Sequence, residues 1–374
     1  MVIYLVLFQS LFFGGGSLFT TITMTNFLVI APFFAIIFIG PSFLRYYRDV
    51  MVVIAIISTG FWIAVNLSPA LHSMSQGWAQ TIGVIVRPET GMFNDNYIIY
   101  TWENMQFYGL YRNPGPFHEP GAFAVFLMLA IISEVFITRK LITRNNLFFF
   151  FNMVTTFSTA GFIGLFIITG FYVLTSKRMT SLTKFFVSGS MFVLIVYLFF
   201  TLEFLGEKIN TQLEDQGNQR LNTSTVGRFL GARKAIIVLY RYPLFGRGLI
   251  TASKAKSTSD EAAGYGWIMW VSQIGVLFGI LYMYMIYKAL KNYSIVNLHN
   301  RLFALFAFIA MLAVLAGQKH TNSWVFFMLV LVPIAFPLRT KAKDYLLNDS
   351  SSKTKIKKRK VLSFTQTDKI LRDK

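Results

Sequence analysis

Apolar residues run through the chain in blocks of about a dozen or more, separated by shorter polar stretches. Most blocks exceed the length of an ordinary strand and approach the roughly 20 residues that span a bilayer. The blocks are Val2–Phe13, Phe27–Ile39, Val50–Val65, Ala122–Ile137, Leu147–Leu174, Phe185–Phe200, Trp267–Tyr287, Leu302–Ala316 and Val325–Phe336. We expect the shorter ones to continue as helix into their polar flanks. The pattern predicts an all-α, polytopic integral membrane protein.

Basic residues between the blocks indicate the cytoplasmic side, because short cytoplasmic loops are enriched in Lys and Arg. The clusters are Arg45 and Arg48; Arg139, Lys140 and Arg144; Lys177, Arg178 and Lys184; and Lys288, Lys291 and Arg301. Leu147–Leu174 lies between two of them, although one crossing cannot join two cytoplasmic loops. Its centre, Thr155–Gly161, is small and polar, so we predict two short helices joined by a turn near the outer leaflet, giving about ten transmembrane helices. A single tilted helix is the alternative.

Two long polar segments, residues 69–116 and 203–266, then face outward as large periplasmic loops. Loops of this length in a compact protein usually carry function. Within the second, Arg228–Tyr242 places apolar residues at helical spacing, which predicts an amphipathic helix on the outer membrane surface. We therefore expect a membrane domain over residues 1–338 and a separate basic tail over residues 339–374.

Composition supports a membrane protein, since 55% of the 374 residues are apolar and only 14% are charged. The net charge of +19 does not indicate nucleic-acid binding, because the tail from Arg339 to Lys374 alone holds twelve Lys/Arg against four Asp/Glu. A basic tail after a final apolar span is typical of a cytoplasmic C-terminus facing anionic lipid. The chain has no cysteine, which excludes a thiolate nucleophile or a disulfide.

The most concentrated candidate chemistry is Tyr111–Gly121, which reads YRNPGPFHEPG immediately before an apolar block. Arg112, His118 and Glu119 stand close together there, in a backbone rich in proline and glycine. Pro120 is acceptable in a first helical turn, so Glu119 begins a helix and has capping as its plain alternative role. Polar groups at the end of a membrane helix more often serve a binding or catalytic function.

A second cluster of candidates lies in the later loop. Arg228 stands at the start of the amphipathic pattern, and Gly246, Arg247 and Gly248 follow its end. Glycines on either side of an arginine would let backbone amides approach a phosphate closely, and Arg suits bidentate phosphate contacts. His320, in a short turn between the last two apolar blocks, is a candidate base, although such a turn needs polar residues in any case.

Other classes of site are not expected. The four histidines are scattered without zinc-ligand spacing, so no metal is predicted, and His72 and His299 read as ordinary loop residues. The chain lacks a phosphate-binding P-loop and a dinucleotide fingerprint, so no nucleotide cofactor is predicted. Whatever the protein binds must reach it from the outer loops or from the bilayer.

These motifs resemble those of one family. The run from Arg112 to Gly121 resembles the Arg-x-x-Gly-x-Phe-x-Glu-Pro-Gly signature of bacterial Wzy-type O-antigen polymerases, which are grouped with O-antigen ligases. Arg228 followed by Pro243–Gly248 is similar to their second signature, and Gly264–Gly279 to the span that follows it. The likeness covers about two-thirds of the chain. It departs at Ser158–Gly161, where relatives often have Ser-Arg.

The resemblance implies a metal-independent glycosyltransferase of GT-C-like architecture in the bacterial inner membrane. Its substrates would be undecaprenyl-pyrophosphate-linked oligosaccharides, and a chain-length regulator protein would be a partner. Arg112 and Arg228 would hold the pyrophosphate, while Glu119 or His320 would accept the proton of the attacking hydroxyl. An O-antigen ligase that transfers glycan to lipid A-core is an alternative. A flippase is another, but it should show repeated halves and charged residues deep in its spans, neither of which is evident.

Overall fold

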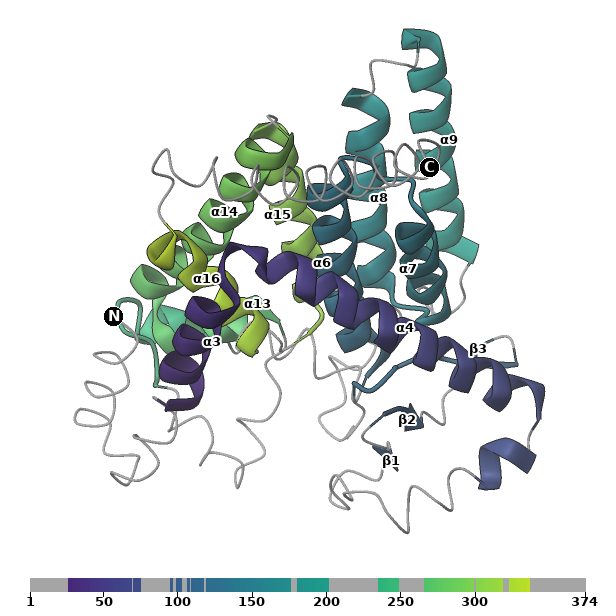
Figure 1. Ribbon diagram of the computed structural model, residues 1–374, viewed down its shortest axis with the longest axis horizontal. Coiled ribbons are helices and arrows are strands. Elements are labelled where there is room, and N and C mark those ends of the chain that lie inside the picture. The colour runs from purple at the N-terminus through teal and green to yellow at the C-terminus, as the bar shows by residue number, and fades with distance from the viewer. Residues whose placement is uncertain are drawn as a thin grey trace, which may run out of the picture.

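The computed structural model describes residues 26–68, 70–74, 95–96, 99–102, 106–107, 109–117, 119–175, 180–201, 235–248, 266–298, 301–318 and 323–336. Helices form most of these residues (Figure 1), as the apolar blocks predict. The expected first span Val2–Phe13, most of the second loop and the basic tail lie outside the described residues.

The helices follow the apolar blocks closely. In the first half of the chain they are η1 (Asn26–Ile30), α3 (Ala31–Ile39), η2 (Gly40–Ser42), α4 (Phe43–Leu67), α6 (Pro120–Thr138), α7 (Arg144–Thr155), α8 (Thr159–Thr175) and α9 (Ser181–Thr201). In the second half they are α13 (Trp267–Ile274), α14 (Val276–Leu298), α15 (Arg301–Leu315) and α16 (Trp324–Ala335). Two antiparallel pairs of short strands, β1 (Asp95–Asn96) with β2 (Thr101–Trp102) and β3 (Gln106–Phe107) with β4 (Leu110–Tyr111), follow α4 in the chain.

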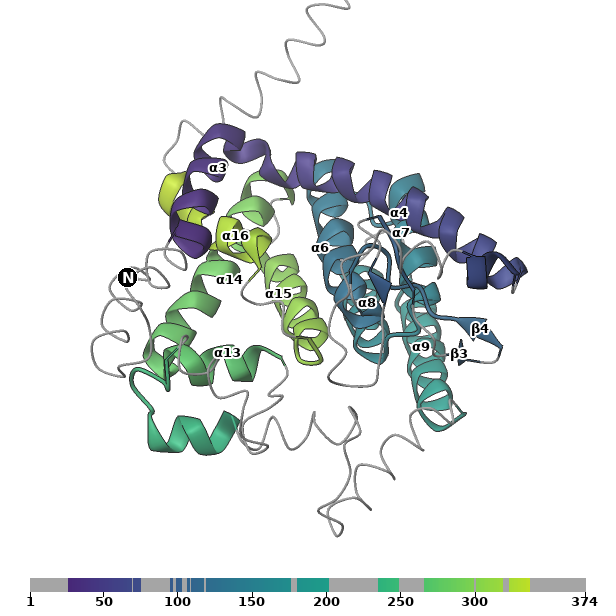
Figure 2. The ribbon, with the colours of Figure 1, turned by 90° about the horizontal axis from the view of Figure 1, so that it is seen from below.

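Helix α6 is the centre of the bundle. Its residues from Pro120 to Phe136 are all buried, and α4, α7, α8, α14 and α15 pack around it. Figures 1 and 2 show α4 as a long rod that crosses this group obliquely. The Tyr47 hydroxyl on α4 donates to the carbonyl of Phe126 on α6 at 2.8 Å, so the crossing is fixed by a hydrogen bond as well as by apolar packing.

The segment Leu147–Leu174 forms two short helices, α7 and α8, joined by a turn at Thr156–Ser158, which confirms the predicted pair of helices. The predicted place of this turn near the outer leaflet stays a prediction. Glycines bring α8 close to its neighbours: a Cβ on Gly161 would lie 2.7 Å from the Met153 sulfur, and one on Gly164 would lie 2.5 Å from Val314. Small residues at such positions let helices approach at backbone distance.

The block Trp267–Tyr287, expected as one span, is instead broken at Gly275 into α13 and α14. Gly275 has a φ of 85°, and a Cβ there would lie 2.1 Å from the carbonyl oxygen of Leu244. Only glycine accepts both the left-handed backbone and this close approach. The break therefore follows from a contact with a distant segment, although Ser272 and Gln273 just before it already interrupt the apolar run.

The basic segments of the first half and the second half meet at one end of the bundle. The Tyr293 hydroxyl, near the end of α14, donates to the carbonyl of Pro41 at 3.2 Å. Phe136 at the end of α6 contacts Tyr293 and Phe303, and Phe303 also contacts Phe171 near the end of α8. We call the region formed by the starts of α4 and α15 and the ends of α6, α8 and α14 the basic end.

Within the described residues, two helical stretches are long and apolar enough to cross a membrane: Ala31–Leu67 and Pro120–Thr138. The first is largely exposed, and the second is mostly buried inside the bundle. Three shorter apolar helices, Thr159–Thr175, Leu302–Leu315 and Trp324–Ala335, accompany them. The protein is thus mainly helical with two candidate membrane-spanning stretches among its described residues, while the expected count of ten spans remains a prediction.

Candidate functional site

The chain reaches the first motif through a segment that docks on the second half of α4. The Tyr111 amide donates to Asn66 Oδ1 at 2.7 Å, and its carbonyl accepts from Trp62 Nε1 at 2.7 Å. The ring of His72 stacks on Tyr111 with centroids 4.2 Å apart. These contacts fix the backbone immediately before Arg112.

Asn113 anchors the next part of the motif in the protein interior. Its side chain has no exposed surface, and it donates to Thr155 Oγ1 at 3.0 Å and to Asn152 Oδ1 at 3.3 Å. Its own Oδ1 accepts from the amide of Gly115 at 3.1 Å. Thr59 on α4 donates to the same Asn152 oxygen at 3.1 Å. A buried polar group is costly unless it is satisfied, so this network ties the motif firmly to α4 and α7.

Arg112 is half-buried against the turn between α7 and α8. Its Nε donates to the carbonyl of Thr156 at 3.1 Å, and its Nη2 lies 3.5 Å from the carbonyl of Phe157. These carbonyls follow the last turn of α7, where a helix presents acceptors and its negative dipole end to a cation. The predicted turn between α7 and α8 therefore orients Arg112, the leading candidate residue of the first motif.

Glu119 precedes α6, with Pro120 in the first helical position as expected. Its side chain makes no capping hydrogen bond to the helix. One carboxylate oxygen instead accepts a hydrogen bond of 3.0 Å from Nε2 of Gln318, 199 residues later. The plain alternative that Glu119 serves as a helix cap is therefore not what the structure shows.

Arg112 and Glu119 belong to one region because their partners adjoin. A Cβ on Gly317, next to Gln318, would lie 3.7 Å from Ala160, which is only a few residues beyond the carbonyls that hold Arg112. A Cβ on Gly266, which precedes α13, would lie 2.3 Å from the carbonyl oxygen of Ala316. We call this region, formed by the starts of α6, α8 and α13 and the ends of α7 and α15, the polar end. It lies opposite the basic end, because α6 runs from one to the other.

The second motif packs on the break between α13 and α14. The amide of Arg247 donates to the Ser272 carbonyl at 3.0 Å, and that of Gly248 donates to the Gln273 carbonyl at 3.1 Å. Gly246, with a φ of 67°, lies so close to Gln273 that a Cβ would come within 2.5 Å of its carbonyl.

This geometry corrects one expectation for the second motif. The amides of Gly246 and Gly248 bond to protein carbonyls instead of pointing at an anion site, Gly246 donating to Tyr242 at 3.1 Å. The two glycines serve a close backbone contact. Arg247 is half-buried, and its side chain remains a candidate for substrate binding.

The amphipathic helix is described only in its second part, where residues 235–241 are helical. Ile236 is 57% exposed and Tyr240 is 88% exposed, as expected for side chains that meet lipid. Three candidates, His118, Arg228 and His320, lie outside the described residues, so the structure brings together only Arg112 and Glu119 of the proposed catalytic group.

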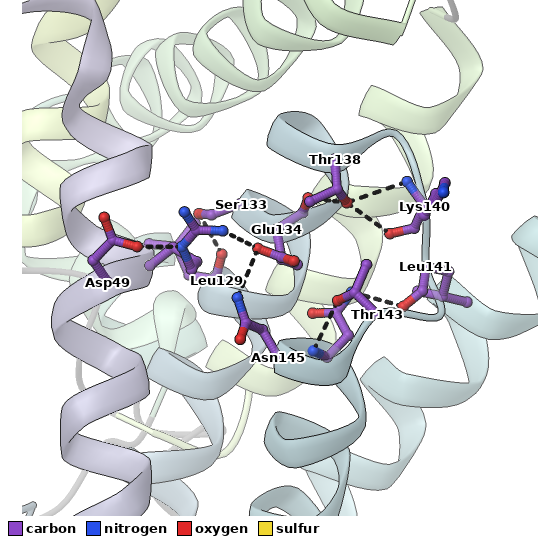
Figure 3. A network of polar contacts seen from close by, with 11 residues as sticks. Asp49, Leu129, Ser133, Glu134, Thr138, Lys140, Leu141, Thr143 and Asn145 are labelled. Carbon is purple, nitrogen blue, oxygen red and sulfur yellow. Dashed lines mark hydrogen bonds and ion pairs between the residues drawn. The ribbon is translucent and has the colours of Figure 1, made fainter. Parts of the chain in front are cut away.

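Sequence reasoning missed a buried ion pair at the basic end. Glu134 is 2% exposed and pairs with Arg48 of α4, which also contacts Asp49 (Figure 3). Asn145 of α7 adds a longer contact of 3.5 Å to the same carboxylate oxygen. The sequence signal for this ion pair is the presence of an acid, Glu134, inside the apolar block Ala122–Ile137. It lies one turn before α6 ends at Thr138, so it joins helices near the bundle end and is not a charge in mid-span.

His72 was also misjudged as an ordinary loop residue. It is 7% exposed, and its stacking on Tyr111 links it to the residue before Arg112. Burial lowers the pKa of His72 from its usual value. No sequence signal distinguishes such a histidine, because its burial depends on the docking of a loop on α4.

Comparison with known proteins adds no relative. No family model, curated protein or solved structure matches the chain. Among the described residues, no group of three or more His, Cys, Asp or Glu side chains is placed to hold a metal ion.

Proposed function

We propose that this protein is a membrane glycosyltransferase that polymerises undecaprenyl-pyrophosphate-linked repeat units into O-antigen or another surface polysaccharide. The observation that carries the proposal is that Arg112 and Glu119 both lie at the polar end, with the basic segments at the opposite end. The resemblance of the two arginine-bearing motifs supplies the reaction class.

The separation of the two ends suits a substrate presented at the outer face of the cytoplasmic membrane. Basic segments favour the cytoplasmic side, and the polar end then faces the periplasm. Lipid carriers would enter from the bilayer between helices, and the basic tail would remain cytoplasmic.

The proposed reaction needs a cation for the leaving group and a base for the nucleophile. Arg112, held at the end of α7, stabilises the negative charge that develops on the pyrophosphate as its bond to the sugar C1 breaks. Glu119 accepts the proton of the attacking sugar hydroxyl as the new glycosidic bond forms at that carbon. The leaving pyrophosphate takes the electron pair of the broken bond, and the proton held by Glu119 then passes to it or to water. The products are a glycan longer by one transfer and free undecaprenyl pyrophosphate, so charge and protons balance.

The experiment that tests this function is deletion of the gene in its native host, followed by gel analysis of surface glycan. A polymerase predicts loss of the length ladder while a single repeat unit stays attached. Loss of all attached glycan would contradict the polymerase and indicate a ligase or flippase. An unchanged ladder would contradict all three functions.

A further inference from the structure

The contact between Gln318 and Glu119 holds information about the proposed site that neither motif contains. Gln318 is 5% exposed at the end of α15, and its Nε2 donates to the Glu119 carboxylate at 3.0 Å. Its backbone amide donates to the Leu315 carbonyl at 3.2 Å, which continues the last turn of the helix. Burial and this anchored backbone restrict the amide to a small region above the start of α6.

Gly121 provides the space that the amide occupies. A Cβ at this position would lie 2.2 Å from Gln318 Nε2 and 2.9 Å from Cδ. Gly121 has an ordinary helical backbone and does not require glycine for its conformation. The absence of a side chain in the first turn of α6 is therefore explained by the presence of Gln318, since alanine is otherwise the better helix former.

We propose that Gln318 is a positioning residue that orients the Glu119 carboxylate for proton transfer, and that Gly121 makes this contact sterically accessible. The inference rests on the proposed function, in which Glu119 is the base. A primary amide suits the role because it donates a hydrogen bond to a carboxylate without bringing a second charge. By fixing one oxygen, it fixes the plane of the carboxylate and hence the direction from which a hydroxyl proton is accepted.

The first test measures polymer elongation in membrane vesicles from the deletion host, which carry that host's own lipid-linked repeat unit, complemented with each variant. Gln318→Met keeps the side-chain length but lacks the donor, and we expect a rate about tenfold lower, the usual scale for a lost hydrogen bond to a charged group. Gln318→Glu places a second carboxylate against the first. Because like charges at this distance raise the apparent pKa of the pair, the acidic limb of the rate–pH profile should move upward by about one unit.

The second test separates this contact from a general loss of folding. Gly121→Ala leaves both polar residues in place but displaces the amide, so its rate should fall as in Gln318→Met. The double variant Gly121→Ala with Gln318→Ala should be no slower than Gln318→Ala alone, because the added methyl group then meets empty space. Asn146→Ala is the control: it removes a buried amide that donates to the Leu141 carbonyl at 2.9 Å near the basic end, and its pH profile should match the wild type.

Failure of the inference and failure of the proposed function give different results. If Glu119→Gln is inactive while both Gln318 variants keep the wild-type rate and pH profile, the positioning role is wrong and the base assignment stands. If Glu119→Gln is fully active, the positioning role of Gln318 and the assignment of Glu119 as the base are both wrong. If Gly121→Ala and Gln318→Ala reduce the rate additively, the two residues act separately and the proposed geometry is contradicted.

Discussion

The two ends of the bundle hold their charged groups in opposite ways. At the basic end, the Glu134 carboxylate is buried against the Arg48 guanidinium, so an acid meets a cation. At the polar end, Arg112 donates to main-chain carbonyls and Glu119 accepts from a neutral amide. These hydrogen bonds orient the two charged side chains through neutral groups. The first arrangement serves cohesion between helices, and the second suits a site that receives a charged substrate.

The largest expected effect on stability is at the basic end. Glu134→Ala should lower the free energy of unfolding by about 3 kcal/mol, because Arg48 would lose the carboxylate that compensates its burial. Thermal unfolding in detergent measures this loss. Asp49→Ala is the matched control: its side chain is 57% exposed, so we expect a change of no more than about 1 kcal/mol although it contacts the same arginine. Equal effects from the two variants would contradict the role assigned to burial.

A smaller loss is expected from the polar network beneath Arg112. Asn152→Ala removes the acceptor shared by Thr59 and Asn113 and should cost about 2 kcal/mol, mainly because the buried Asn113 amide loses a partner, whereas the half-buried Thr59 hydroxyl can still donate to the Ala55 carbonyl. Because the network fixes the motif, polymer elongation should fall with it. Asn145→Ala, which removes only a 3.5 Å contact at the basic end, should leave elongation unchanged. Normal elongation in Asn152→Ala would show that the network does not position Arg112.

A gain in stability is expected at the end of α6. Arg139 adopts a left-handed backbone with a φ of 62°, directly after the helix ends. Arg139→Gly should raise the free energy of unfolding by about 0.5 kcal/mol, because glycine adopts this conformation without steric cost. The glycan ladder should not change, since the residue lies far from the polar end. A shortened ladder would contradict the claim that the basic end serves stability and only the polar end serves the reaction.

The smallest effect is a pH dependence at His72, which lies in the helical segment of residues 70–74 and stacks on Tyr111. The pKa of His72 is lowered by burial, so below its ordinary value near 6.5 the unfolded chain binds more protons than the folded one. Stability should fall as the pH drops through that value towards the lowered pKa of the folded state, and stay level above it. His72→Phe keeps the stacking on Tyr111 and should remove this dependence. An identical pH profile of thermal unfolding in the variant would contradict the assignment.

The sequence predicted the features that depend on local pattern. The helices follow apolar blocks, and the turn at Thr156–Ser158 follows from small polar residues inside one of them. The break at Gly275 was missed although Ser272 and Gln273 interrupt the apolar run just before it. It forms through contact with Leu244, 31 positions earlier in the chain, which local pattern does not reveal.

Some residues of the candidate site were likewise predictable from local pattern, and others were not. Arg112 and Glu119 were predicted because a polar cluster before an apolar block is conspicuous. The roles of Gln318 and Asn152 were not predicted. The role of a buried amide depends on which group faces it, and packing between distant segments decides which group that is. Glu134 was visible as an acid in an apolar block, but its partner Arg48 lies 86 residues away.

The proposed function requires that Arg112 at the polar end acts on the substrate, and a comparison of two arginine variants tests this requirement. The deletion host is complemented with Arg112→Ala or with Arg144→Ala, which removes an exposed arginine at the start of α7 on the opposite side of the bundle. With equal protein levels, the account predicts that Arg112→Ala abolishes the glycan ladder, with elongation at least a hundredfold slower, on the order of the loss of an electrostatic stabiliser of the transition state. Arg144→Ala should keep the ladder. A full ladder in Arg112→Ala would show that Arg112 does not act on the substrate.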